Sequence, residues 1–127
     1  VEILLSYLKS NGILLIAVPN CNSYDAQIYG KYWAAYDVPR HLYHFVPKTT
    51  EKYFKTKGLS LEKTLPMPLD SFYVSMLSEK YIAQETGKSA NFGMARAVIR
   101  GFISNLKAIS TQGTSSSHIY IFKKDAF

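Results

Sequence analysis

The spacing of hydrophobic residues along this chain changes several times between the pattern of a helix and that of a strand. The apolar residues at positions 1–8 are dense enough for a buried helix, and Asn11-Gly12 supplies the left-handed stop that ends helices. An unbroken apolar run follows at residues 13–18 and ends at Pro19. Such a run is typical of a strand that is covered on both faces, as in parallel sheets.

The second half of the chain predicts a further helix and two further strands. Pro47 fits a first helical position, and residues 48–57 predict a short helix that Gly58 closes. Alternating apolar and polar residues predict a half-covered strand at 59–65, and a last strand is expected at 118–124.

Two amphipathic helices are expected between those strands. The first is capped by Asp70, or by the residue before it, and ends at Gly87. The second covers about residues 91–109, and a flexible connector follows at 111–117. Large apolar side chains of such helices face the core. The expected core positions are Leu69, Phe72, Tyr73, Met76, Leu77 and Tyr81 in the first helix, and Ala95, Val98, Phe102, Leu106 and Ile109 in the second.

This order of elements predicts an α/β fold with one sheet and flanking helices, because its strands alternate with helices. We expect a single domain over residues 1–127, in which residues 66–112 form a helical insertion between the last two strands. Three strands are few for 127 residues, and the chain opens inside a predicted helix. Both features suggest the second part of a longer domain.

The composition is that of a globular protein. Hydrophobic residues make up 47% and charged residues 19% of the chain, which excludes wholesale disorder. No apolar run approaches the roughly 20 residues that a membrane-spanning helix needs. The single Cys21 cannot form an intramolecular disulfide, and no secretory signal opens the chain. We therefore expect a cytoplasmic protein.

The net charge of +6 is unevenly placed. No acidic residue lies between Glu85 and Asp125, whereas this third of the chain holds six basic residues: Lys88, Arg96, Arg100, Lys107, Lys123 and Lys124. One interpretation is a solvated helix face. The alternative is a non-enzymatic binding module whose basic helices bind an anionic partner or a membrane surface.

The long segment 20–46 is the place where chemistry is expected. It leaves the carboxyl end of the first predicted strand, and ligands of open α/β sheets bind at such ends. Long loops without secondary structure are usually functional or disordered, and seven aromatic residues favour an ordered one: Tyr24, Tyr29, Tyr32, Trp33, Tyr36, Tyr43 and Phe45. These rings form either a wall over a polar organic substrate or a cover for the edge of the sheet.

Charged and ionisable residues are interleaved with these rings. A neutral imidazole of His41 or His44 could take a proton from a hydroxyl or amine nucleophile near pH 7, or it could only hold the loop by a hydrogen bond. Arg40 is either a clamp for a carboxylate or phosphate or the partner of Asp37. Cys21 and the two histidines lack the paired spacing of zinc ligands, so we expect no metal.

Motifs for nucleotide binding and for serine chemistry are absent from the sequence. The seven glycines are scattered singly, and none opens a helix after a predicted strand. There is no Gly-x-Ser-x-Gly elbow and no cysteine pair.

Two segments carry a resemblance to a known family. Residues 8–20, Leu-Lys-Ser-Asn-Gly followed by an apolar run and Pro-Asn, resemble the segment that leads into the fifth strand of class I S-adenosylmethionine-dependent methyltransferases. That family typically has Pro and Gly where Ser10 and Asn11 stand here. Residues 39–47, Pro-Arg-His-Leu-Tyr-His-Phe-Val-Pro, are similar to the subgroup (methyltransferase type 11/12/23-like) with an Arg-His-Leu-Tyr-His-Phe-(Ser/Thr)-Pro signature. Val46 takes the place of the capping Ser or Thr.

The resemblance implies a partial Rossmann-like methyltransferase sheet. The three strands would be the last three of seven, with the final strand antiparallel and inserted between the other two. The family holds S-adenosylmethionine mainly in its front half, on motifs that this chain lacks, so we assign no cofactor-binding residue here. The positions that match the acceptor side are His41 and His44 as catalytic residues, and Asn20, Trp33, Asp37, Arg40 and Tyr43 as substrate-binding residues.

The function implied is the acceptor-side half of a methyltransferase. It would transfer a methyl group to a small-molecule or sugar-type acceptor, and it would be inactive as an isolated fragment. Its partners would be that acceptor and the front half of the same domain, with no nucleic acid. Without that half, one flank of residues 13–18 would be an exposed apolar edge, so we expect self-association.

Overall fold

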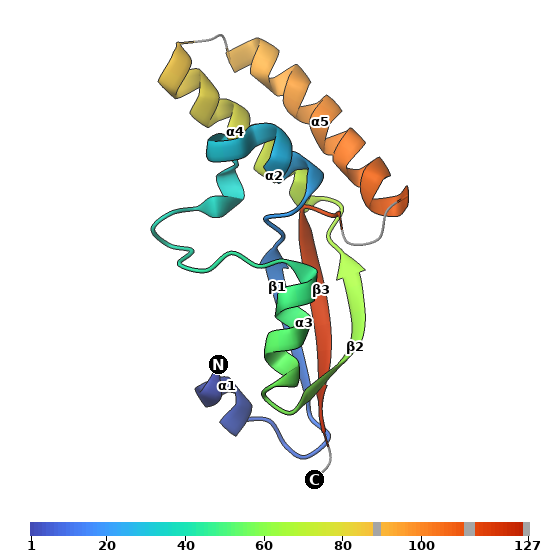
Figure 1. Cartoon of the computed structure of the whole chain (residues 1–127). Coiled ribbons are helices and arrows are strands. Elements are labelled where there is room, and N and C mark those ends of the chain that lie inside the picture. The colour runs from blue at the N-terminus through green and yellow to red at the C-terminus, as the bar shows by residue number, and fades with distance from the viewer. Residues whose placement is uncertain (88–89, 111–113, 126–127) are drawn as a thin grey trace.

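The computed structural model describes residues 1–87, 90–110 and 114–125. Its helices and strands follow the order that the sequence predicts, with additional short helices in the segment after the first strand (Figure 1). In chain order they are α1 (Glu2–Ser6), β1 (Ile13–Pro19), α2 (Tyr24–Tyr29), the 3-10 turns η1 (Gly30–Tyr32) and η2 (Ala34–Tyr36), α3 (Pro47–Lys55), β2 (Leu59–Pro66), α4 (Asp70–Thr86), α5 (Ala90–Ser110) and β3 (Ser117–Lys124).

The strands form one sheet in the order β1-β3-β2, and β3 runs antiparallel to both neighbours. The last strand of the sequence is therefore the central one, as predicted. In the register, Ile121 of β3 lies opposite Leu15 of β1, and Ile119 lies opposite Leu65 of β2. The result is a mixed α/β fold with a three-stranded antiparallel sheet and flanking helices.

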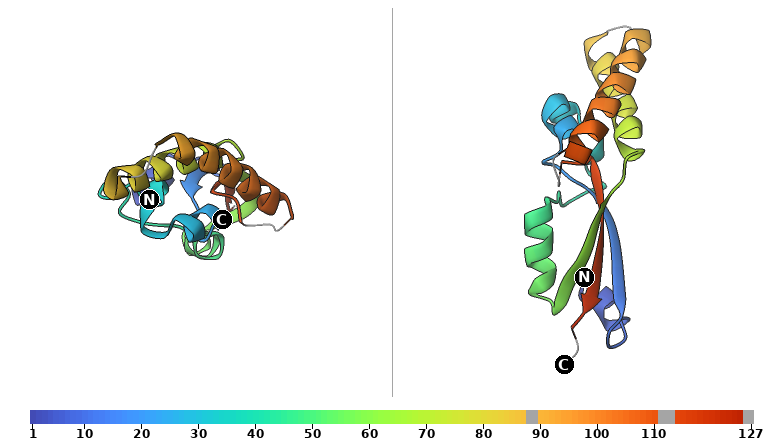
Figure 2. Two further views of the ribbon diagram at one scale, coloured as in Figure 1. Left: turned by 90° about the horizontal axis from the view of Figure 1, so that it is seen from above. Right: turned by 90° about the vertical axis from the view of Figure 1, so that its right-hand side faces the viewer.

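Helix α3 covers one face of this sheet (Figure 2, right). Pro47 is its first residue, and Val46 provides no side-chain cap. Gly58 follows the helix with a left-handed φ of 74°, which turns the chain into β2. The core on this face consists of Phe54, Leu59, Tyr120 and Phe122, with Leu5, Leu8, Leu14, Ile16, Val18 and Leu61 packed against them.

The prediction that β1 is covered on both faces is wrong. Burial alternates along this strand, and Ile13 and Leu15 are 65% and 61% exposed. The physical reason is that α3 shields only the face that holds Leu14 and Ile16. In the described sheet β1 is also an edge strand. The expected self-association through this edge stays a prediction.

Helix α1 is shorter and more exposed than the sequence predicts. Ile3 and Tyr7 are 72% and 80% exposed, and α1 contains no buried residue. A helix of little more than one turn can present only one side to the sheet. Lys124 of β3 donates hydrogen bonds to the Leu5 and Leu8 carbonyls, at 3.5 and 3.1 Å, and so ties α1 to the sheet.

The segment after β1 is more ordered than its sequence pattern indicates. Ser23 caps α2 by accepting a hydrogen bond from the Ala26 amide at 3.2 Å. The expected flexible connector at 111–117 is also partly wrong. Residues 111–113 lie outside the described part, but Ser115, Ser116 and Ser117 are buried.

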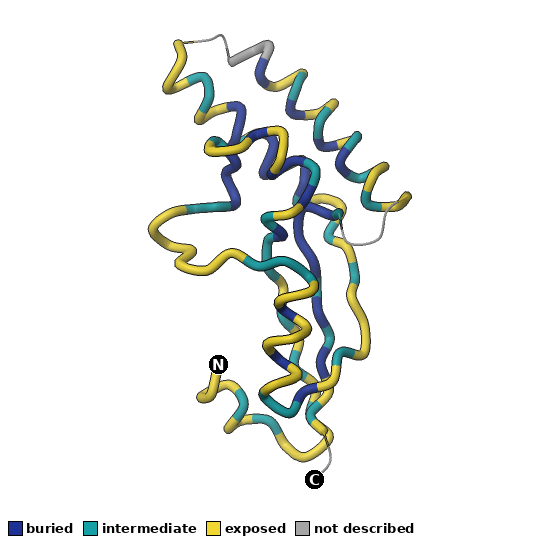
Figure 3. The backbone as a smooth tube through the Cα atoms, in the orientation of Figure 1, coloured by how far each residue is buried: buried dark blue, intermediate teal, exposed yellow. Residues whose placement is uncertain are grey.

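Helices α4 and α5 form a hairpin beyond one end of the sheet (Figure 1). The prediction is wrong for most of the expected core positions, because the buried positions of the two helices, dark blue in Figure 3, hold mainly small and polar residues. Phe72 and Leu77 are half-buried, as expected of core positions. Phe102 and Ile109 of α5 are 57% and 81% exposed, and Leu69, just before α4, is 81% exposed. The inner face of α4 is formed by Ser71, Val74, Ser75, Ser78 and Glu79, and that of α5 by Gly93, Ala97, Gly101 and Ser104.

The close approach of the two helices explains this reversal. A Cβ added at Gly101 would lie 2.6 Å from Cδ1 and 3.1 Å from the backbone Cα of Phe72. Phe72 occupies the space beside Gly101, and larger side chains on the inner face of α5 would separate the helices. The large apolar residues of α5 therefore point away from the interface. Asp70 is the first residue of α4 rather than its cap, because the N-cap is Leu69.

We predict opposite effects for two glycine substitutions in α5. Gly101→Ala should lower the free energy of unfolding by about 1–3 kcal/mol, since its Cβ overlaps Phe72. Gly93→Ala is the matched control, because its Cβ would lie 3.4 Å from the nearest atom, in Glu79. It should raise stability by up to about 1 kcal/mol through helix propensity. Urea unfolding followed by circular dichroism measures both, and equal effects would contradict the close packing.

Candidate functional site

A cavity of about 250 Å³ lies at the carboxyl end of β1. Pro19 forms one wall, the segment after η2 contributes Asp37, Arg40 and His41, and α4 contributes Tyr73 and Tyr81 among others. A smaller cavity of about 100 Å³ shares Pro19, Ala35 and His41, and it is also lined by Trp33, Tyr43, His44 and others. His41 therefore lies between the two cavities.

Both predicted histidines are anchored to η2. Nδ1 of His41 lies 3.1 Å from the Ala35 carbonyl oxygen, and Nε2 of His44 lies 3.0 Å from that of Tyr36. A carbonyl oxygen only accepts, so each of these ring nitrogens carries the hydrogen. In the neutral rings the other nitrogen, Nε2 of His41 or Nδ1 of His44, is then the basic one. Each histidine holds the loop and also retains the nitrogen that a base needs.

Asp37 and Arg40 form an ion pair. Nη2 and Nε of Arg40 donate to Oδ1 of Asp37 at 2.6 and 3.0 Å. Of the two roles predicted for Arg40, the geometry supports that of partner to Asp37. The Arg40 side chain is 79% exposed, so the pair adds at most about 1 kcal/mol to stability. Asp37 adopts a left-handed φ of 40°, which turns the chain and places both residues at the cavity.

Two residues expected to bind substrate serve mainly as scaffold. Asn20 is 1% exposed: its side-chain amide donates to the Ser115 carbonyl at 3.1 Å, and its side-chain oxygen accepts from the Asn22 amide at 3.1 Å. Trp33 is 2% exposed. It lines part of the smaller cavity. Tyr43 also lines that cavity and is largely exposed.

The buried carboxylate of Asp25 is a residue that the sequence analysis missed. It accepts hydrogen bonds from Trp33 Nε1 at 2.8 Å, from Ser104 Oγ at 3.1 Å and from Ser116 Oγ at 2.6 Å. These donors come from the aromatic segment, from α5 and from the residue just before β3. No local sequence pattern marks Asp25, because its partners lie up to 91 residues away.

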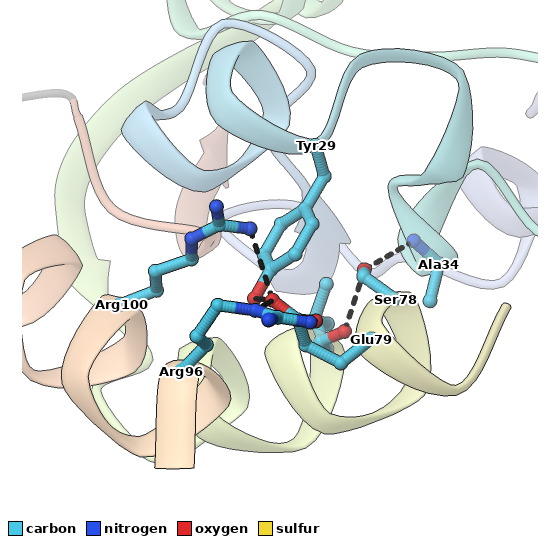
Figure 4. Close-up of polar contacts among 7 residues, drawn as sticks. Tyr29, Ala34, Ser78, Glu79, Arg96 and Arg100 are labelled. Atoms are coloured by element: carbon cyan, nitrogen blue, oxygen red, sulfur yellow. Dashed lines mark hydrogen bonds and ion pairs between the residues drawn. The ribbon is translucent and has the colours of Figure 1, made fainter. Parts of the chain in front are cut away.

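A second buried carboxylate, Glu79 of α4, joins α2 and α5 (Figure 4). Arg96 Nη2 donates to it at 2.7 Å, Arg100 Nη1 at 3.0 Å and the Tyr29 hydroxyl at 3.4 Å. Burial raises the pKa of Tyr29, and the hydrogen bond to Glu79 raises the pKa of Arg96. Two cations of the basic third are thus paired inside the chain.

Other basic residues of that third also make contacts within the chain. Lys107 Nζ lies 4.4 Å from the centre of the Tyr24 ring, and Lys124 binds the α1 carbonyls. Lys123 is exposed, and Lys88 lies outside the described residues. Four of the six cations thus make contacts within the chain, although Lys107 stays exposed and the Arg96 side chain is 42% exposed.

Asp70 and His118 are two further residues whose surroundings the sequence did not predict. Asp70 lines the larger cavity and accepts a hydrogen bond from Ser117 Oγ. His118 of β3 is 2% exposed, and its Nδ1 has no hydrogen-bond partner among the described residues. Burial lowers the pKa of His118. Its ring is therefore neutral at pH 7.

Comparison with known proteins identifies no relative. No protein-family model matches the sequence, and neither the curated proteins nor the solved structures include a significant match. Within residues 1–87, 90–110 and 114–125, no helix meets the length and hydropathy that a membrane span requires. The same residues contain no group of three or more His, Cys, Asp or Glu side chains placed to hold a metal ion.

We predict that His118 makes stability depend on pH in the weakly acidic range. Unfolding returns its pKa from the lowered value to about 6.5, so the unfolded chain binds more protons below that pH. Stability should be complete above about pH 6.5 and should fall below it, by at most about 1.4 kcal/mol per pH unit.

Urea unfolding between about pH 5.5 and 7.5 measures this dependence, in a window above the titration of ordinary carboxyl groups. His118→Phe should flatten the profile. His44→Phe replaces an exposed histidine and should keep the wild-type slope. Equal slopes in wild type and His118→Phe would contradict the prediction.

Proposed function

We propose that this chain is the acceptor-side half of an S-adenosylmethionine-dependent methyltransferase. The observation that carries the proposal is the sheet order β1-β3-β2, in which the final strand is inserted antiparallel between two strands that run in the same direction. This is the edge arrangement that the methyltransferase resemblance implies. The cavity at the carboxyl end of β1 adds support, since that is where α/β sheets bind ligands.

We assign no cofactor-binding residue to this chain, because its sequence has no glycine-rich turn after a strand. The buried carboxyl groups of Asp25 and Glu79 are hydrogen-bonded within the chain. The cofactor would bring an already activated methyl group. All roles assigned to this chain are therefore roles toward the acceptor.

The larger cavity matches a small acceptor. Its volume of about 250 Å³ is just below the roughly 300–1,000 Å³ typical of ligand pockets. Tyr73 and Tyr81 of α4 supply aromatic surface for a ring, and Arg40 has further N–H donors beyond those paired with Asp37. The acceptor class that fits is a small polar molecule, such as a sugar, with a hydroxyl or amine nucleophile.

His41 is the residue we assign as general base. It lines both cavities, and its Nδ1–H bond to Ala35 leaves Nε2 to take the proton of the acceptor nucleophile. His44 lines only the smaller cavity of the two, so its role is to hold η2 in place. Most of the remaining catalysis would come from alignment of the acceptor.

The first test reads the coding sequence upstream of Val1. We expect a strand followed by a glycine-rich turn about 100 residues earlier, as in dinucleotide- and nucleoside-binding βαβ units. The protein encoded by the whole reading frame should bind S-adenosylhomocysteine in calorimetry, and the 127-residue chain should not. A start codon directly before Val1, or a whole protein that does not bind, would contradict the proposal.

The second test substitutes the proposed base in that whole protein. In His41→Asn the side-chain amide keeps a donor for the Ala35 carbonyl but has no basic nitrogen. The rate of methyl transfer from labelled cofactor to acceptor from cell extract should fall about 10²–10⁴-fold, and affinity for S-adenosylhomocysteine should not change.

His44→Gln is the matched control for this substitution, because its longer side-chain amide can reach the position of Nε2 and preserve a comparable bond to Tyr36. It should reduce the rate far less than His41→Asn does. Equal rates for wild type and His41→Asn would remove His41 as the base, while the cofactor-binding result would still decide the class of enzyme.

A further inference from the structure

The outer face of α5 is an uninterrupted apolar surface. Met94, Val98, Phe102 and Ile109 follow one another at helical spacing, and they are 53%, 53%, 57% and 81% exposed. Ile99 and Leu106, at 59% and 50%, widen this surface. At 1.5 Å per residue the 21 residues of α5 extend over about 30 Å. We call these six residues the α5 apolar face.

The fold does not use this face for its own packing. Inside the hairpin, α5 contacts α4 through Gly93, Ala97, Gly101 and Ser104. Large exposed apolar patches of soluble domains mark contact surfaces, so the α5 apolar face points to a contact outside the chain.

A groove extends the apolar surface toward α4. It has a volume of about 520 Å³, and Met76 and Ala83 of α4 line it together with Met94 of α5. Methionine side chains adapt their shape to irregular partners. Met94 belongs both to this groove and to the α5 apolar face. Glu79 and Lys80 of α4 also line the groove, and Glu79 is paired there with Arg96 and Arg100.

The net charge beside this surface is positive, because Lys80, Arg96 and Arg100 outnumber Glu79. Every charged residue of α5 is basic, and no acidic residue lies anywhere between Glu85 and Asp125. Arg96 and Arg100 pair with Glu79, which neutralises only one of their two charges. Lys107 keeps its charge above the Tyr24 ring. An apolar face bordered by cations is complementary to an apolar partner with an anionic rim.

We propose that the α5 apolar face docks the protein on the surface of a membrane that contains anionic lipid. Amphipathic helices with basic borders bind in this way, with the apolar face about 5–10 Å deep at the headgroup boundary. A second copy of the chain is a poorer occupant, because it would bring the same cations together. This surface attachment does not depend on methyl transfer.

Vesicle flotation with the full chain tests the proposal. Wild type should float with vesicles of phosphatidylcholine and about 30% phosphatidylserine, and should bind phosphatidylcholine alone several-fold more weakly. The double variant Val98→Glu/Phe102→Glu puts two carboxylates on the α5 apolar face, and it should lose at least about tenfold in vesicle partitioning. Both positions are exposed, so thermal unfolding by circular dichroism should show an intact fold.

Ile3→Glu/Tyr7→Glu is the matched control. These residues are also apolar, exposed and four apart. Ile3 belongs to α1 and Tyr7 is its C-cap, and α1 lies at the opposite end of the molecule from α5 (Figure 1). The control should float as wild type does. The proposal is overturned if wild type stays in solution, if both double variants float equally, or if Val98→Glu/Phe102→Glu only converts a dimer into a monomer in light scattering.

Discussion

The buried carboxylate of Asp25 is the interaction on which the arrangement of this molecule depends. A carboxyl group with 0% exposure is tolerated only where hydrogen bonds replace its lost water. Trp33, Ser104 and Ser116 supply those bonds from three separate parts of the chain. Loss of Asp25 would leave three buried donors without their acceptor, so the aromatic segment, α5 and the start of β3 are held together as one unit.

The candidate site is a consequence of this anchoring. Trp33 immediately precedes η2, so its fixed position also positions η2. The Ala35 and Tyr36 carbonyl oxygens of η2 then accept hydrogen bonds from His41 and His44. Ser78 of α4 donates to the Val74 carbonyl and accepts from the Ala34 amide at 2.9 Å, which docks η2 on α4 (Figure 4). The site is thereby supported by α4 and by the carboxyl end of β1. Most of its ionisable groups nevertheless belong to the irregular segment after η2.

The hairpin of α4 and α5 shows how buried polar groups and small residues can replace an apolar core. Glu79 with its two arginines holds the helices together, as does Ser71, whose hydroxyl donates to the Gly101 carbonyl, and Gly101 lets the backbones approach. The large apolar residues are then free to face outward. The same packing therefore explains both the stability of the hairpin and the apolar surface that we assign to a membrane.

The sequence by itself determined most of the helices and strands, since Pro47, Gly58 and Gly87 mark boundaries through local backbone preferences. The strand order was expected only from the resemblance to methyltransferases. The sequence also indicated His41, Asp37 and Arg40, because aromatic and ionisable residues gather in one segment. Only the tertiary structure decided which faces are buried. The spacing of apolar residues identifies one face of α5. Whether that face turns inward depends on the distance between α5 and α4, which Gly101 and Glu79 set. The roles of Asp25 and His118 likewise depend on contacts between residues far apart in the chain, which no local pattern encodes.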